Sequence, residues 1–204
     1  MSWTGDVYDG TIGRALRGIR HEVADLIRKE RLFPVLDLCC GTGAQLRLFQ
    51  HPLRLGLDID GRMLIHARRK CPAAHFMRAD ASRIPIRGGT LGGVIVSYAL
   101  HEKDGKTRRE MMAEIRRVLH PNGRLILIDF DPPWNLASRI GWIATFAIER
   151  MAGGEHFRNG RDFIRAGGLS EFVREQGLEI LRDRPMELGN SRLLVTGFSE
   201  ERLD

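Results

Sequence analysis

The residues most able to bind a ligand form a glycine-rich turn directly after an apolar run. Val35–Leu38 is followed by two cysteines and then by Gly41-Thr42-Gly43. Glycine has no Cβ, so the backbone of this turn can approach a bound molecule closely. A dinucleotide-binding loop would have a third glycine where Leu46 stands, and the Gly-Lys-Ser/Thr of a phosphate-binding loop is absent. The turn therefore predicts close contact with a ligand but no pyrophosphate binding. The alternative interpretation is a purely structural turn between a strand and a helix.

Two aspartates at the ends of the next two apolar runs favour the ligand-binding alternative. Asp58 ends the second run and Asp80 follows the third. A carboxylate after the second strand of such a fold can accept hydrogen bonds from both hydroxyls of a ribose. Asp80 could accept a hydrogen bond from the exocyclic amine of an adenine. Each aspartate alone could cap a helix, but together with the glycine turn they predict a nucleoside-containing ligand at the carboxyl ends of adjacent strands.

Short apolar runs alternate with helical patterns, and these elements must position the turn and the aspartates. We expect strands at residues 32–38, 53–57, 74–77, 91–99 and 124–130, and helices at residues 12–30, 42–50, 60–70 and 104–119. Strands that are apolar throughout and alternate with helices predict a parallel sheet covered on both faces.

The C-terminal part has a different pattern. A helix is expected at residues 168–176, followed by strands at 178–181 and 193–196. The short connection between these strands favours a hairpin, so the last strand should be antiparallel. Residues 134–152 are helical by pattern and lie outside the minimal sheet. We expect one domain with an N-terminal helical cap (1–31), a cofactor-binding core (32–131), a helical lid (132–160), and a C-terminal helix and strand hairpin (161–204).

With these features the sequence resembles the class I S-adenosylmethionine-dependent methyltransferases, and more narrowly the ubiquinone/menaquinone-biosynthesis C-methyltransferase type. The segments that carry the resemblance are VLDLCCGTG (35–43), LGLDIDGRML (55–64), RADASRIP (78–85), VSYALHE (96–102) and EIRRVLHPNGRLILIDF (114–130). It implies a Rossmann-like α/β fold with seven mostly parallel strands, one of them antiparallel, and helices on both faces. The implied cofactor is S-adenosylmethionine, the implied product is S-adenosylhomocysteine, and no metal is expected.

The resemblance also implies how the methionine and ribose moieties are held. Asp37, Gly41 and Gly43 would shape the loop around the methionine moiety. Asp58 would hold the ribose. Tyr8 would close the site from the N-terminal helix.

The adenine and the methyl group would have their own contacts. Ile59 and Met63 would flank the adenine, and Asp80 with the backbone of Ala81 would read its edge. Ser97 would lie beneath the methyl group.

Methyl transfer from a sulfonium is an in-line displacement, so positioning and exclusion of water should supply most of the catalysis. A base is needed only if the acceptor must lose a proton of high pKa. Candidate catalytic residues are Tyr98 and His101, near the end of the fourth strand, and His156, which could reach in from the lid. His101 is read either as a general base or as a polar loop residue.

Two alternatives to small-molecule methylation stay open on the sequence. Asp131-Pro132-Pro133-Trp134 resembles the amine-binding box of N-methyltransferases, although it follows the fifth strand rather than the fourth, and it would suit RNA or protein methylation. The second alternative is a cofactor-binding module without catalysis. Cys39 and Cys40 stand where the resemblance expects small residues, so we interpret them as packing residues.

The charge and composition of the chain indicate which classes of binding partner to expect. The 204 residues carry 32 Lys and Arg against 26 Asp and Glu, a net charge of +6. The positive charges are spread along the chain, which is typical of solvated helix faces, so we do not expect nucleic-acid binding. The apolar lid pattern favours a small hydrophobic acceptor, and the basic charge is compatible with peripheral contact to an anionic membrane.

The N-terminus lacks the pattern of a signal peptide and the three cysteines lack metal-ligand spacing, so we expect a cytoplasmic protein.

Overall fold

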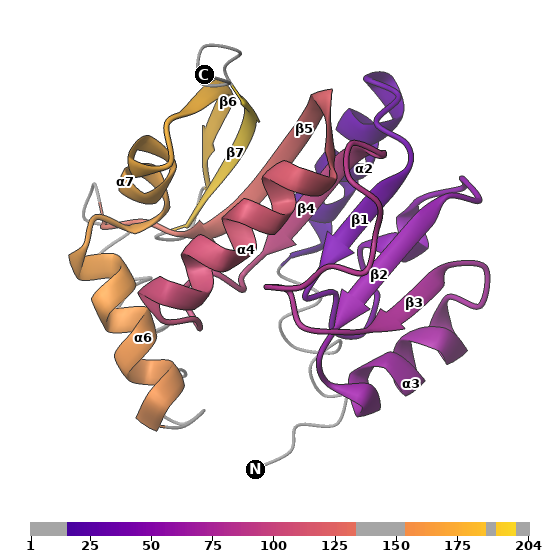
Figure 1. Cartoon of the computed structure of the whole chain (residues 1–204), viewed down its shortest axis with the longest axis horizontal. Coiled ribbons are helices and arrows are strands. Elements are labelled where there is room, and N and C mark those ends of the chain that lie inside the picture. The colour runs from indigo at the N-terminus through magenta and orange to yellow at the C-terminus, as the bar shows by residue number, and fades with distance from the viewer. Residues whose placement is uncertain (1–15, 134–153, 187–190, 199–204) are drawn as a thin grey trace. The chain divides into compact units, whose positions relative to one another are not determined.

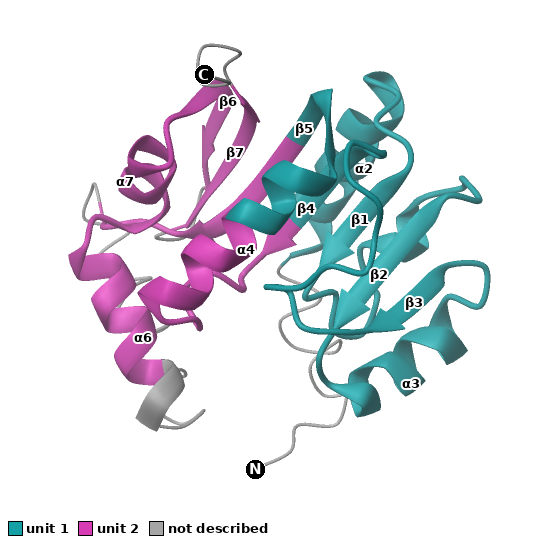
Figure 2. Cartoon of the chain, viewed as in Figure 1, with its two compact units in different colours: residues 1–95, 113–124 teal, residues 96–112, 125–204 magenta. Residues whose placement is uncertain are grey.

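The computed structural model describes residues 16–133, 154–186 and 191–198 (Figure 1). Hydrogen bonding orders its strands as β3-β2-β1-β4-β5-β7-β6 in one seven-stranded sheet. The chain divides into two compact units, residues 1–95 with 113–124 and residues 96–112 with 125–204 (Figure 2).

Unit 1 contains the parallel strands that follow the glycine turn. Strand β1 (Val35–Leu38) pairs with β2 (Arg54–Asp58), which pairs with β3 (His75–Arg78), and all three are parallel. All four residues of β1 are buried, as expected for a strand covered on both faces. Helices α2 (Arg17–Lys29) and α3 (Gly61–Lys70) and the 3₁₀ turn η1 (Leu46–Leu48) belong to this unit.

The helix predicted at residues 42–50 is wrong. The chain forms only the short turn η1 there, and Phe49 is already extended, with φ −94° and ψ 134°. Gly41 and Gly43 explain the difference, because both have positive φ, at 51° and 68°. Backbone in the left-handed region cannot continue a right-handed helix, so the glycines that open the loop also prevent a helix from starting at its first residue.

The helices predicted to begin near residues 60 and 104 each start at a capping aspartate. The carboxylate of Asp60 accepts a hydrogen bond of 2.8 Å from the backbone N–H of Arg62 and begins α3. Asp104 accepts from the N–H groups of Lys106 and Thr107, at 2.8 and 2.9 Å, and begins α4 (Gly105–Val118). These bonds lower the pKa of both carboxyls.

Two further strands cross from one unit into the other along the chain. They are β4 (Leu91–Ser97) and β5 (Leu119–Phe130). The fifth strand begins directly after α4, earlier than the predicted residue 124, so residues 121–123 lie inside the strand rather than in a turn before it.

Unit 2 contains the predicted antiparallel strand. Strand β7 (Ser191–Phe198) is antiparallel to both of its neighbours, β5 and β6 (Leu178–Pro185), which confirms the prediction. Helices α6 (Gly154–Arg165) and α7 (Gly168–Glu175) precede β6. The expected boundary between lid and C-terminal part, at residue 160, falls inside α6.

Tyr8 and the predicted helix at 134–152 lie outside the described residues. No described helix is long and apolar enough to cross a membrane.

Candidate cofactor site

The glycine turn leaves open space beside Gly41. The N–H of Cys40 donates to the carbonyl of Leu57 at 3.0 Å, and the N–H of Gly43 donates to the carbonyl of Cys40 at 2.9 Å. A Cβ built on Gly41 would have no heavy atom within 4 Å apart from its chain neighbours. The backbone at Gly41 therefore has open space beside it, into which a ligand could approach.

Gly43 has a different environment. A Cβ there would lie 3.0 Å from the Phe76 ring and 3.2 Å from the Cβ of Ala67. Gly43 is buried against α3 and β3, so the absence of a side chain is needed for packing inside unit 1.

We expect Gly41→Ala and Gly43→Val to separate binding from folding. Gly43→Val should destabilise the chain by about 2–4 kcal/mol, because overpacking and left-handed strain add there. Gly41→Ala adds a methyl in open space, so it should cost only about 1–2 kcal/mol of strain and mainly weaken cofactor binding. Thermal melting and titration of S-adenosylhomocysteine measure the two effects. A Gly43→Val protein that melts like the wild type would refute the packing role.

Asp58 ties the end of β2 to the glycine turn. Its Oδ2 accepts a hydrogen bond of 2.7 Å from the N–H of Gly41, and its Oδ1 accepts one of 2.9 Å from the N–H of Asp60. A carboxylate has about four acceptor positions, so two of them remain for hydroxyl donors. Asp58 therefore both fixes the turn and can accept hydrogen bonds from a ribose.

The neighbouring strand end brings the predicted adenine-binding residues into the same unit. Asp58 is in register with Arg78 on β3, two residues before Asp80. The Asp80 carboxylate is exposed and accepts from both the N–H and the hydroxyl of Ser82 at 2.9 Å. Ile59 is 62% exposed, so its side chain presents apolar surface to solvent. A flat apolar ring lying on Ile59 would remove this surface from water.

The remaining adenine candidates have intermediate or low exposure. Met63 is half-buried on the first turn of α3, and Ala81 is buried directly after Asp80. Ala81 can therefore offer its backbone but little side-chain surface to a ligand.

Asp37 is a buried carboxyl at the centre of β1. Burial raises its pKa to about 7; the positive charge of Arg20 opposes this increase and the negative charge of Asp58 adds to it. Asp37 can therefore change its charge near neutral pH. Burial also raises the pKa of the Cys40 thiol, which keeps it neutral and supports its interpretation as a packing residue.

Unit 2 holds the catalytic candidates that the structure describes. Tyr98, which follows the half-buried Ser97, donates from its hydroxyl to Ser191 Oγ at 3.1 Å. His101 is buried, and its Nδ1 lies 2.7 Å from Oδ1 of Asp129. The side chain of His156 and the whole of Tyr8 lie outside the described residues.

Asp129 is a residue that sequence analysis missed. It is 1% exposed, and besides His101 it accepts backbone N–H bonds from Leu100 at 2.9 Å and from Phe130 at 2.8 Å. The sequence did contain a signal for it, since Asp129 is a carboxylate inside the apolar run of β5. A buried charge needs a partner, so such a residue indicates a polar contact.

Asp131 is engaged in anchoring α7. Its Oδ2 lies 2.7 Å from Nε of Arg192 and accepts a hydrogen bond of 2.6 Å from the Ser170 hydroxyl. Its Oδ1 accepts from the N–H of Ser170 at 2.8 Å. These contacts give Asp131 a structural role and favour that role over amine binding.

Comparison with known proteins agrees with this arrangement. A methyltransferase-domain family matches residues 35–123, which include β1 to β3, the glycine turn, Asp58 and Asp80. A demethylmenaquinone methyltransferase from Thermotoga maritima is 28% identical over 178 residues, covering 79% of this chain and 76% of that protein. The matched domain and these relatives support a class I S-adenosylmethionine-dependent methyltransferase.

Solved structures show the same fold. An O-methyltransferase family protein from Burkholderia thailandensis has a TM-score of 0.70 at 21% identity, covering 97% of this chain and 60% of that one. Magnesium protoporphyrin IX methyltransferase from Synechocystis, solved with bound S-adenosylhomocysteine, has a TM-score of 0.63 at 19% identity, covering 89% of this chain and 83% of that one. Alignments to several other curated relatives span about half of their lengths, 46% to 54%.

Within this methyltransferase, unit 1 contains all the described candidates for the methionine, ribose and adenine moieties. Asp37 lies within β1, Gly41 follows β1, and Asp58 ends the adjacent strand β2. Gly43 has a packing role. Unit 2 contains Ser97, Tyr98 and His101.

Proposed function

We propose that this methyltransferase transfers a methyl group from S-adenosylmethionine to a small hydrophobic acceptor of the quinol type. The observation that carries the cofactor assignment is the Asp58 carboxylate, which lies beside the open face of Gly41. The acceptor class is supported by the relative from Thermotoga maritima, whose name describes methylation of a demethylmenaquinone. Peripheral contact with an anionic membrane, where such acceptors dissolve, is part of the proposal.

The residues of unit 1 fit the cofactor. Asp58 would accept from the ribose hydroxyls, Ile59 would lie against the adenine, and the backbone at Gly41 would leave room for the methionine moiety. When bound, the cofactor supplies a methyl group already activated by a sulfonium. The protein then has to orient the acceptor and exclude water.

His101 is proposed as the group that accepts a proton from the acceptor. In this proposal Nδ1 of His101 donates a hydrogen bond to Oδ1 of Asp129, which lies 2.7 Å away. His101 can then exchange a proton only at Nε2. Asp129 would act as a positioning residue that fixes the ring and its tautomer, as carboxylates do for catalytic histidines in other enzymes.

Replacing His101 by glutamine should lower kcat by about 10²–10⁴-fold and leave cofactor affinity nearly unchanged, because proton transfer contributes on that scale. Asp129→Asn should lower kcat and alter the pH profile of the rate, since the asparagine cannot hold the same tautomer. Steady-state kinetics with a quinol acceptor measure both effects, with thermal melting as the folding control. A folded His101→Gln protein with wild-type kcat would make His101 a polar loop residue.

The proposal is tested by offering the protein several acceptors with S-adenosylmethionine and measuring S-adenosylhomocysteine by mass spectrometry. A naphthoquinol with a short prenyl tail should give turnover that exceeds that of the same ring without the tail. An RNA oligonucleotide and a basic peptide are the controls for N-methylation. Turnover on these alone would overturn the acceptor class, and cofactor binding without turnover on any acceptor would favour a non-catalytic module.

A further inference from the structure

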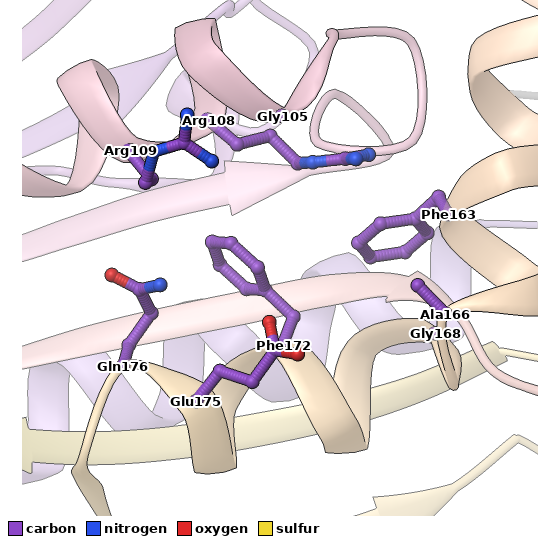
Figure 3. Close-up of a pocket in the computed structure, with 9 residues that line it drawn as sticks. All are labelled: Gly105, Arg108, Arg109, Phe163, Ala166, Gly168, Phe172, Glu175 and Gln176. Carbon is purple, nitrogen blue, oxygen red and sulfur yellow. The ribbon is translucent and has the colours of Figure 1, made fainter.

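Unit 2 contains a cavity of about 170 Å³ that none of the proposed cofactor or catalytic residues lines. Arg108 and Arg109 of α4 form one side of it, and Phe172 and Gln176 form the other, with Phe163 of α6 at one end (Figure 3). Its walls therefore combine positive charge with aromatic surface.

Arg108 is the unusual side chain of this cavity. Its guanidinium lies 4.9 Å from the centre of the Phe163 ring, and its Nη1 approaches the carbonyl oxygen of Leu100 at 3.5 Å. Arg108 is half-buried, and burial lowers its pKa against the combined attraction of Asp129, Asp104 and two other carboxylates. Within the described ranges, no carboxylate forms an ion pair with it at 4.0 Å or less. A partly desolvated guanidinium without a paired anion favours an external one.

The charge balance limits which anion fits. Arg109 adds a second positive charge, whereas Glu175 places one carboxylate at the same cavity. The cavity residues therefore carry a net charge of one, which suits a monoanion better than a phosphate with two charges. Gln176 adds an amide that can donate a further hydrogen bond.

The aromatic walls of the cavity limit the shape of the ligand that it can bind. Phe163 and Phe172 are 2% and 7% exposed, and their rings are 6.2 Å apart with planes at 56°. They are fixed by packing and offer an apolar surface next to the two cations. A cavity of about 150 Å³ accepts a benzene ring, so one aromatic ring with a carboxylate matches the available space.

We propose that this cavity binds an aromatic carboxylate, whose charge is held by Arg108 and Arg109 and whose ring packs against Phe163 and Phe172. The site is built within unit 2, and its binding does not depend on the proposed methyl transfer. It would be a second ligand site of the enzyme, separate from the cofactor residues of unit 1.

Titration calorimetry of the full chain with benzoate tests the proposal. Benzoate should bind saturably, with at least tenfold higher affinity than benzamide, which has the same shape without the charge, and than acetate, which has the charge without the ring. Arg109→Gln should weaken benzoate binding at least tenfold, because the loss of one hydrogen bond to a charged group typically lowers affinity by that factor or more. Arg158→Gln, an exposed arginine on α6 outside the cavity, is the matched control and should bind like the wild type.

Arg109 is exposed, so its replacement should not affect folding, whereas Arg108→Gln also removes the contact with Phe163. Arg109→Gln therefore decides the test if Arg108→Gln melts early. Equal affinity for benzoate and benzamide, or unchanged benzoate affinity in Arg109→Gln, would overturn the proposal. Equal affinity for benzoate and acetate would overturn its aromatic part.

Discussion

Replacing Asp58 by alanine is expected to weaken S-adenosylmethionine binding at least tenfold. Each hydrogen bond to a charged group contributes about 1.5–3 kcal/mol, and the proposed ribose contact has two. The substitution also removes the acceptor of the Gly41 and Asp60 N–H groups, so the turn loses its attachment to β2. Titration calorimetry with the cofactor, on protein whose folding is verified by circular dichroism, measures the loss.

Asp60→Ala is the matched control for this experiment. It removes a carboxylate two residues along the chain but leaves both hydrogen bonds of Asp58, since Asp60 donates from its backbone. It should cost about 1 kcal/mol of stability through the lost cap of α3 and leave cofactor affinity within about threefold. Unchanged affinity in a folded Asp58→Ala protein would remove the ribose assignment.

Asp37 should make the stability of the free protein fall as pH rises. The pKa of its carboxyl is raised from 3.8 to about 7 in the folded chain, so the unfolded chain loses this proton at lower pH than the folded chain does. Well below about pH 4 both states hold the proton, and the titration of Asp37 no longer changes stability with pH. Between about pH 4 and 7 the folded state becomes progressively less stable, by about 4 kcal/mol in total.

Asp37→Asn isolates this effect, because asparagine resembles the protonated aspartic acid and does not titrate. The free energy of unfolding of Asp37→Asn relative to the wild type should therefore increase with pH over this window. Urea unfolding at several pH values between 4 and 8 measures the difference. A difference that does not vary with pH would show that the Asp37 carboxyl does not have its raised pKa.

The strand pattern of the fold could be predicted because its causes are local. Apolar runs set the strands, and Asp60 and Asp104 cap their helices through residues two or three positions away. The short connection between the last two strands sufficed to predict that β7 is antiparallel. The failed helix at 42–50 also has a local cause, but a positive φ at Gly41 and Gly43 cannot be distinguished from ordinary helical glycine by composition alone.

The site was predictable only in part, because several roles depend on residues distant in sequence. Gly43 is adjacent to Phe76 in space, and no spacing rule indicates that contact. His101 was a candidate from its position after the fourth strand, but its partner Asp129 lies in the next strand, 28 residues later. Asp131 resembled part of an amine-binding box until the structure showed its contacts with Ser170 and Arg192.

A crystal structure of the chain with S-adenosylhomocysteine tests the central claim most directly. We expect both ribose hydroxyls within hydrogen-bond distance of the Asp58 carboxylate, the adenine against Ile59, and the homocysteine moiety beside Gly41. Ordered ligand bound away from Asp58 would contradict the assignment of the cofactor site to unit 1.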